Sequence, residues 1–238
     1  MKGLKRTLLV ALDNLKEGIE MARSPRAEFD AELTDLQNEV LVLGSMVEKA
    51  IAKSIEALRT RNIDDSRDVI AEDDLIDDKR HEIEDKCIAL IARQQPMATD
   101  LRQIVAFLHI AVDLERMGDY AEGIGKIGLL MGEQPPLKPL IDIPRMCEIA
   151  NDMLRRSLDG LVKRDVIIAN QVVEDDDEVD ALYDQVYREL VLLMVQDPKT
   201  IERATFLLWT AHDLERVADR ATNIAEQVIY LVSGREPR

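Results

Sequence analysis

The chain has few aromatic residues, few glycines and only two cysteines. Phe, Trp and Tyr together make up 3% of its 238 residues, and glycine occurs 10 times. Such a composition argues against a β-sandwich or barrel, whose strands are rich in aromatic side chains and whose turns use glycine. Because 46% of the residues are hydrophobic and 33% are charged, long amphipathic helices are favoured, and we expect an all-α protein.

The two cysteines, Cys87 and Cys147, are too few and too far apart for a disulfide framework or a CxxC metal pair. We interpret both as small core residues of a cytoplasmic protein. No segment approaches the ~20 apolar residues of a membrane helix, and Asp13 ends the apolar run that follows the basic N-terminus. The sequence therefore predicts a soluble protein that is neither secreted nor inserted into a membrane.

Positive charge is also scarce. The chain has 31 Lys and Arg against 47 Asp and Glu, which gives a net charge of −16. A surface with this excess repels nucleic-acid phosphates and anionic lipid. We therefore expect divalent cations, or a protein partner with a basic patch, and no nucleic acid.

Hydrophobic residues recur at helical spacing along most of the chain. The predicted helices cover residues 30–60, 65–93, 99–131, 145–163, 166–196 and 199–233. Four of the eight prolines fall in residues 132–144, which we interpret as a connection between two units. The predicted organisation is an N-terminal extension (1–27), a first three-helix bundle (28–132), a Pro-rich connection (133–144) and a second three-helix bundle (145–238).

An internal repeat supports this division. The segment DLERMGD at residues 113–119 recurs as DLERVAD at 213–219, and DDLID at 73–77 corresponds to DDEVD at 176–180. Both segments recur in the same order, so the whole unit is duplicated. The fold class we expect is two tandem three-helix bundles related by internal duplication.

Carboxylates interrupt the apolar stripes of these helices. Asp73 and Asp176 occupy equivalent places in the core-facing stripes of the two middle helices, and Glu115 and Glu215 end the stripes of the two last helices. A further aspartate follows each of them by four residues, on the same helix face. The candidate metal ligands are thus Asp73, Asp77, Glu115, Asp119, Asp176, Asp180, Glu215 and Asp219.

Distances counted from the hairpin turns place the two carboxylate pairs of each unit at about the same level. Four carboxylates on a half-buried face repel one another, so either some are protonated or a cation is bound. Oxygen ligands without histidine favour hard cations such as Mg²⁺, Mn²⁺, Ca²⁺ or iron. His81, His109 and His212 fall at unmatched places in the repeat, and we do not assign them as ligands.

The first helix contains FDAEL at 29–33, the first hairpin contains QPMATDLR at 95–102, and the two last helices carry the DLER segments. This combination, which covers residues 28–234, resembles the PhoU family of bacterial phosphate-signalling regulators. It implies two tandem three-helix bundles, and it implies that the eight carboxylates bind metal. Iron and Mg-, Mn- or Zn-type divalent cations are all compatible with that implication, as single ions or as multinuclear clusters.

The resemblance further implies a cytoplasmic negative regulator that is not an enzyme. Such a protein links a phosphate ABC transporter and its ATPase to a sensor histidine kinase, and it represses the phosphate-starvation response. Two departures stand out: Ala218 replaces the glycine found at Gly118, and residues 1–27 exceed the usual family start. A homodimer is compatible with the sequence, although no interface can be named from it.

Two other functions are compatible with the residues. A carboxylate-bridged metalloenzyme would use the same ligands, but such bundles pair Glu with a histidine three residues on, and neither unit has that spacing. A metal-free helical adaptor would use its carboxylates only to meet a basic partner. Arg116 and Arg216, each three residues after an aspartate, are interpreted either as structural ion-pair partners of Asp113 and Asp213 or as residues that support the metal ligands.

Overall fold

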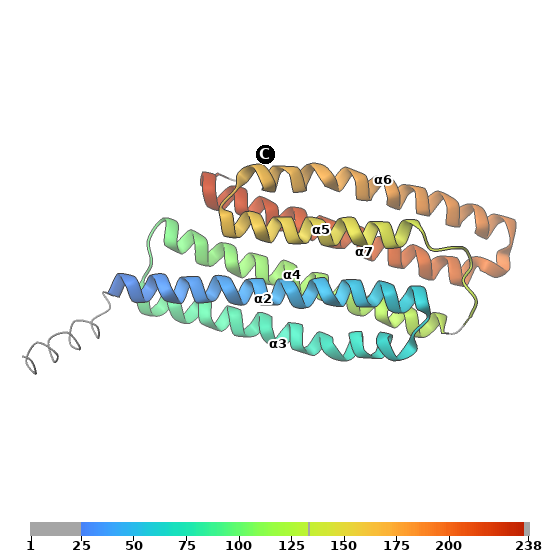
Figure 1. Ribbon diagram of the computed structural model, residues 1–238, viewed down its shortest axis with the longest axis horizontal. Helices are drawn as coiled ribbons and strands as arrows, with labels where there is room; N and C mark the ends of the chain where they lie inside the picture. Colours follow the sequence, from blue (N-terminus) through green and yellow to red (C-terminus); the bar gives the residue numbers. More distant parts are fainter. Residues whose placement is uncertain (1–24, 133, 236–238) are drawn as a thin grey trace, which may run out of the picture. The chain divides into compact units, whose positions relative to one another are not determined.

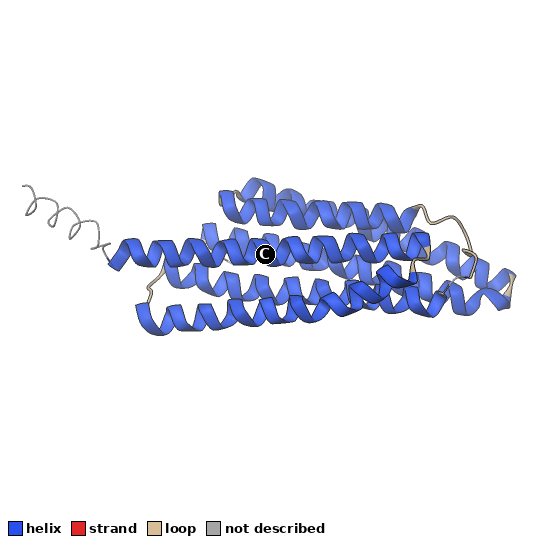
Figure 2. Ribbon diagram, turned by 60° about the horizontal axis from the view of Figure 1, so that its bottom comes forward, coloured by secondary structure: helices blue, strands red, loops and turns tan. Residues whose placement is uncertain are grey.

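The computed structural model describes residues 25–132 and 134–235, and every regular element in those ranges is helical (Figures 1 and 2). The long helices are α2 (Pro25–Thr60), α3 (Ile63–Gln94), α4 (Thr99–Met131), α5 (Asp142–Lys163), α6 (Val166–Gln196) and α7 (Ile201–Ser233), with a 3₁₀ turn, η1 (Pro198–Thr200), before α7. The all-α prediction is confirmed. Most of the predicted N-terminal extension, residues 1–27, lies outside the described residues.

The start of α2, residues 25–35, belongs to a compact unit separate from the rest of the chain. Pro25 stands at the first helical position, where its missing N–H costs no hydrogen bond. Arg26 pairs with Asp30 at 2.9 Å and lies over the ring of Phe29. The helix therefore begins five residues before the predicted start at residue 30.

From residue 36 onward the chain forms two three-helix bundles. In the first, α3 packs on α4, and Lys53 of α2 pairs with Glu72 of α3 at 2.9 Å. In the second, α5, α6 and α7 pack on one another, as their parallel course in Figure 1 shows. The repeat therefore corresponds to two copies of one helical unit, as the sequence predicts.

Helix ends follow the local sequence, with one exception. Asn62 and Asp165 accept hydrogen bonds from backbone N–H groups in the first turns of α3 and α6, as N-cap residues do. At the start of α4 the N-cap position is Ala98, which offers no side-chain cap and has a φ of 50°. Thr99 and Asp100, the nearest residues whose side chains could cap the helix, both lie inside it.

The predicted apolar stripes form the core. Val69, Ile76 and Ile83 are buried on α3, and their counterparts Val172, Val179 and Val186 are buried on α6. Cys87 and Cys147 are free and buried, as expected for small core residues. Among the helices described, none is long and apolar enough to cross a membrane.

Helices α4 and α7 join the two bundles through polar contacts as well as apolar ones. Asp113 of α4 accepts hydrogen bonds from Arg220 (3.2 Å) and Asn223 (3.4 Å) of α7. On the other side of the repeat, the carboxylate of Asp213 lies beside Gly123, where a Cβ atom would be 3.3 Å from Oδ2. The two aspartates of the DLER segments thus serve the contact between bundles.

Candidate metal centre

A glycine sets the distance between α3 and α4 at the first carboxylate group. A Cβ atom at Gly118 would lie 3.0 Å from Ile76 Cγ2 and 3.3 Å from Asp73 Oδ1. A larger side chain would require Ile76 or α3 to shift, because 3.0 Å is shorter than a normal carbon–carbon contact. Gly118 therefore lets α4 approach α3 where their carboxylates meet.

Three of the predicted ligands of the first bundle come together. One carboxylate oxygen from each of Asp73, Asp77 and Asp119 lies within 4.8 Å of the other two. Burial, followed by the charges of Glu122, Asp77 and Asp119, raises the pKa of Asp73 to about 6. Asp77 Oδ1 is buried and has no hydrogen-bond partner among the described residues. Such an orphaned acceptor among like charges is a place where a cation fits.

Glu115, the fourth predicted ligand, is not a member of this three-carboxylate group. Burial raises its pKa, the negative charge of Asp119 raises it further, and the positive charges of Arg116 and Arg80 lower it. Arg80 itself pairs with Glu84. Glu115 therefore borders the group on the side where Arg80 supplies positive charge.

Glu122 is a further acidic residue near this group that is not among the predicted ligands. Its charge raises the pKa of both Asp73 and Asp119, and its carboxylate accepts a hydrogen bond from Lys126. The signal was present, since Glu122 follows Asp119 by three residues and Glu115 by seven, on one helix face. The repeat concealed it, because the equivalent residue in the second unit is Thr222.

The second bundle places its four carboxylates near one another but more loosely. Burial, then Asp180, Asp219 and Glu215, raises the pKa of Asp176 to about 6, and Asp176 Oδ1 is buried without a hydrogen-bond partner among the described residues. Among the described residues of this bundle, no three carboxylates bring one oxygen atom each within 4.8 Å of the other two, as those of the first group do. Asp180 is exposed. Ala218 is fully buried, so the alanine is accommodated between the helices.

The arginines of the DLER segments pair with the carboxylate pairs. Arg216 donates to Asp219 at 2.7 Å, and Arg116 lies 3.5 Å from Asp119. The predicted pairing with Asp113 and Asp213 was wrong, because those aspartates face the other bundle across the α4–α7 contact. The arginines thus partly neutralise the candidate ligands, and Arg216 does so at the shorter distance.

Two of the three histidines lie beside candidate ligands, and the third, His109, lies at the contact between α4 and α7. His81 Nδ1 is 2.8 Å from the backbone carbonyl of Asp77, and His109 Nδ1 is 3.4 Å from Gln227. His212 Nδ1 lies 3.8 Å from Glu215 Oε2. None belongs to the three-carboxylate group, so its donor set consists of oxygen atoms, which favours hard cations.

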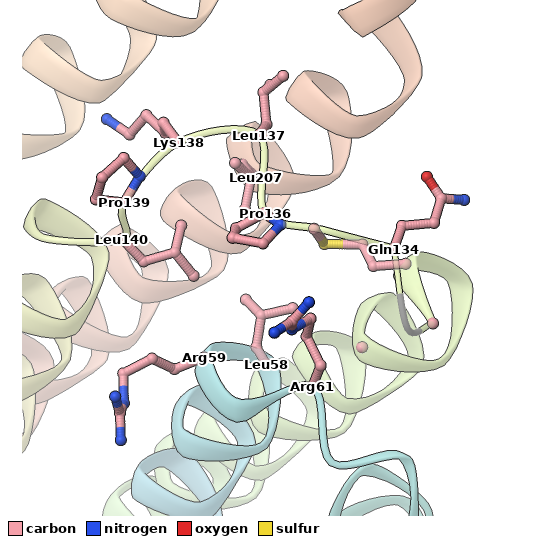
Figure 3. Close-up of a pocket in the computed structure, with 13 residues that line it drawn as sticks. Leu58, Arg59, Arg61, Gln134, Pro136, Leu137, Lys138, Pro139, Leu140 and Leu207 are labelled. Carbon is pink, nitrogen blue, oxygen red and sulfur yellow. The ribbon is translucent and has the colours of Figure 1, made fainter.

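A cavity of about 90 Å³ lies elsewhere, where the ends of α2 and α4 meet the connection and α7 (Figure 3). Its wall is mostly apolar and contains three charged residues. Two of them form ion pairs, Arg59 with Glu56 and Lys138 with Glu189. No candidate ligand lines it, and it carries no nucleophile or general base. The cavity is lined by Leu58, Arg59, Arg61, Gly128, Met131, Gly132, Gln134, Pro136, Leu137, Lys138, Pro139, Leu140 and Leu207.

The fold and the site define a class: duplicated three-helix bundles that carry carboxylates at the contact between their middle and last helices. The PhoU domain model matches residues 40–128 and 143–228, one match in each predicted bundle. The chain belongs to the PhoU family.

Similar proteins cover most of the chain. A phosphate-specific transport system accessory protein PhoU homologue of Aquifex aeolicus is 43% identical over 203 residues, which is 85% of this chain and 92% of that protein. The homologue of Rhizobium meliloti is 37% identical over 88% of this chain and 89% of that protein. The crystal structure of PhoU from Pseudomonas aeruginosa has a TM-score of 0.84 and 34% identity, and the alignment covers 87% of this chain and all of that one.

Proposed function

We propose that this protein is a metal-binding, non-enzymatic regulator of phosphate uptake and signalling in the cytoplasm. The family membership and the names of its relatives as accessory proteins of phosphate transport support the transport role. The three-carboxylate group of α3 and α4 supports metal binding. In this proposal the protein contacts the ATPase of a phosphate ABC transporter and a sensor histidine kinase, and it represses the phosphate-starvation response.

The residues of the first bundle fit a hard cation. Asp73, Asp77 and Asp119 would hold it, with Glu115 and Glu122 beside them. In the second bundle Asp176, Asp180, Glu215 and Asp219 would do the same. Iron and Mg-, Mn- or Zn-type ions all remain candidates, and a bound ion would supply the positive charge that these repelling carboxylates lack.

The observation that carries metal binding is the buried, unpartnered Asp77 Oδ1 inside the three-carboxylate group. An unpaired acceptor at that place costs free energy unless a proton or cation satisfies it. Asp73 and Asp77 lie on α3 and Asp119 lies on α4, so an ion bound by all three would also hold the two helices together. We therefore expect a bound ion to raise the free energy of unfolding of the first bundle.

The test is elemental analysis of protein purified without added metal or chelator. The double variant Asp77→Asn with Asp119→Asn removes two donors of the group, and we expect metal to be lost from the first bundle. The matched control is Asp74→Asn with Asp78→Asn, since both residues are exposed neighbours on α3 and the change in charge is the same. Equal metal content in both double variants would refute the site.

The transport role is tested separately, by binding of the purified protein to the transporter ATPase and to the cytoplasmic part of the sensor kinase. Binding to at least one of them is expected. A protein that binds neither would contradict the regulatory proposal, whatever its metal content. A protein that binds both, holds no metal and has the same melting temperature with and without chelator would favour the metal-free adaptor.

A further inference from the structure

Half of the chain's aromatic residues lie on one exposed face of the second bundle. The chain has eight Phe, Trp and Tyr residues in total. On α6 and α7, Tyr183 lies 6.5 Å from Tyr187, and Phe206 lies 5.9 Å from Trp209, between ring centroids. His212 links the two pairs, since its ring meets Tyr183 edge-on at 6.1 Å and it follows Trp209 by one helical turn. We call Tyr183, Tyr187, Phe206, Trp209 and His212 the aromatic strip.

The aromatic strip is open to solvent. Trp209 is 51% exposed and Tyr187 is 46% exposed, although both are large side chains that gain free energy on burial. Exposed apolar side chains that occur singly are ordinary, but a contiguous aromatic patch is typical of a binding surface. Trp and Tyr are also the residues that dominate the binding energy of protein interfaces.

The first bundle shows that the fold does not require these side chains. At the equivalent positions of the repeat it has Arg80, Glu84, Ala106, His109 and Val112. The same three-helix arrangement therefore forms without an aromatic residue at any of the five places. The aromatic strip must be explained by something that only the second bundle contacts.

The charge around the strip selects the partner. Helix α6 has eight acidic residues and one arginine. Glu215 Oε2 lies 3.8 Å from His212 Nδ1, and burial, followed by the charges of Glu215, Tyr187 and Asp184, raises the pKa of Tyr183. A second copy of this chain would bring another net charge of −16, and an anionic lipid surface would be repelled in the same way. A basic partner is attracted instead.

We propose that the aromatic strip docks an arginine-bearing amphipathic segment of a partner protein. Guanidinium groups stack on Trp and Tyr rings and pair with neighbouring carboxylates, which matches the mixture of rings and acids on this face. The apolar side of the segment covers Trp209 and Phe206. This inference rests on the proposed function, because it locates the surface by which the regulator meets its transporter ATPase or its kinase.

The test uses the residues of the first bundle as replacements. Trp209→His and Tyr187→Glu install what the repeat has at those positions, so both are compatible with the fold, and matching melting temperatures check this. The control is Val112→Ala, which alters an apolar side chain of the first bundle that is 46% exposed. We expect each aromatic replacement to weaken binding to one of the two partners at least ~10-fold, as loss of an interface anchor does, while the control binds as the unchanged protein does.

Two results would overturn the docking surface, and a third would refute the proposed function. The first is unchanged partner affinity in the combined Trp209→His and Tyr187→Glu variant. The second is a dimer of the unchanged protein that Trp209→His dissolves, because the occupant would then be a second copy. The third is that the unchanged protein binds neither partner.

In that third case a direct probe separates the two failures. Trp209 is the chain's only tryptophan, so its fluorescence reports on the strip alone. A synthetic amphipathic helix of leucine and arginine should shift its emission with saturation, and a scrambled peptide of equal charge should not. A shift with the first peptide only would support the docking surface even though the regulatory function is refuted. The absence of any shift would refute the docking surface as well.

Discussion

The two bundles carry the same carboxylates in different surroundings. In the first, Asp73, Asp77 and Asp119 come within 4.8 Å of one another, and Glu122 adds negative charge. In the second, Thr222 replaces Glu122, and Arg216 holds Asp219 at 2.7 Å. Duplication has preserved the candidate ligands, but their neighbours decide how closely the carboxylates gather and how much of their charge is already neutralised.

The same comparison applies to the outer face of each bundle. Arg80 in the first bundle stands where Tyr183 stands in the second, so Glu115 lies beside a guanidinium and Glu215 lies beside a phenol ring. The first bundle therefore gathers its carboxylates at one place, whereas the second bundle exposes aromatic side chains to solvent. We infer that the first bundle is the stronger metal site and that the second is the stronger docking surface.

The largest expected effect concerns metal affinity. Asp73→Asn should weaken binding in the first bundle by at least ~10- to 100-fold, the loss that follows removal of a group supporting a metal ligand. Asp176→Asn should cost the second bundle less, because Arg216 already engages one of its carboxylates. Calorimetric titration of metal-free protein measures both. Equal losses in the two variants would contradict the difference between the bundles.

The next effect concerns packing at the first site. Gly118→Leu should lower the free energy of unfolding by about 1–3 kcal/mol, as overpacking does, because its side chain has no room beside Ile76. Urea denaturation measures this change. Ala218→Gly in the second bundle serves for comparison and should leave metal binding in the first bundle unchanged. Full stability of Gly118→Leu would mean that α3 and α4 are less tightly apposed than they are here.

The third effect is a dependence of stability on pH in metal-free protein. Burial raises the folded-state pKa of Asp73 and of Asp176 to about 6, above the ordinary value for aspartate of 3.8. The folded state therefore binds protons more tightly than the unfolded state, and stability should fall as pH rises from about 4 to about 6 and then level off. Denaturation at pH 5 and pH 7 in chelator measures the fall.

Single variants divide this dependence between the bundles. Asp73→Asn and Asp176→Asn should each reduce the difference between pH 5 and pH 7, and a saturating metal should reverse its sign by favouring the ionised carboxylates. Asp74→Asn, on the exposed side of α3, should leave it unchanged. If the variant that combines Asp73→Asn with Asp176→Asn keeps the full difference in stability between pH 5 and pH 7, that difference originates outside the two carboxylate groups.

The smallest effect is a gain. Arg216→Gln releases Asp219 from an exposed ion pair, whose contribution is about 0.2–1 kcal/mol, so metal affinity in the second bundle should rise by up to about fivefold. Adding Thr222→Glu supplies the counterpart of Glu122 and should raise it further. Weaker binding in the double variant would show that the second bundle differs for another reason. The titration used for Asp73→Asn measures this too.

Much of this protein could be predicted from the sequence. Apolar spacing predicted all six long helices, because a helix buries one face and repeats every 3.6 residues. Some helix starts were predicted less well, since α2 begins five residues and α5 begins three residues before the predicted start. The duplication was visible in the DLER and DDLID segments, and the eight candidate ligands were visible because carboxylates stood where a core stripe requires apolar residues.

Only the tertiary structure decided which of these residues meet. The partner of Arg216 could not be read from spacing, because Asp213 and Asp219 are both three residues away and the packing of α7 on α4 determines which one is free. Glu122 escaped notice because the repeat lacks it, although its charge reaches Asp73 across the helix contact. The sequence specifies which faces are polar, whereas the distance between two such faces follows from side chains such as Gly118 that hold the helices at a particular separation.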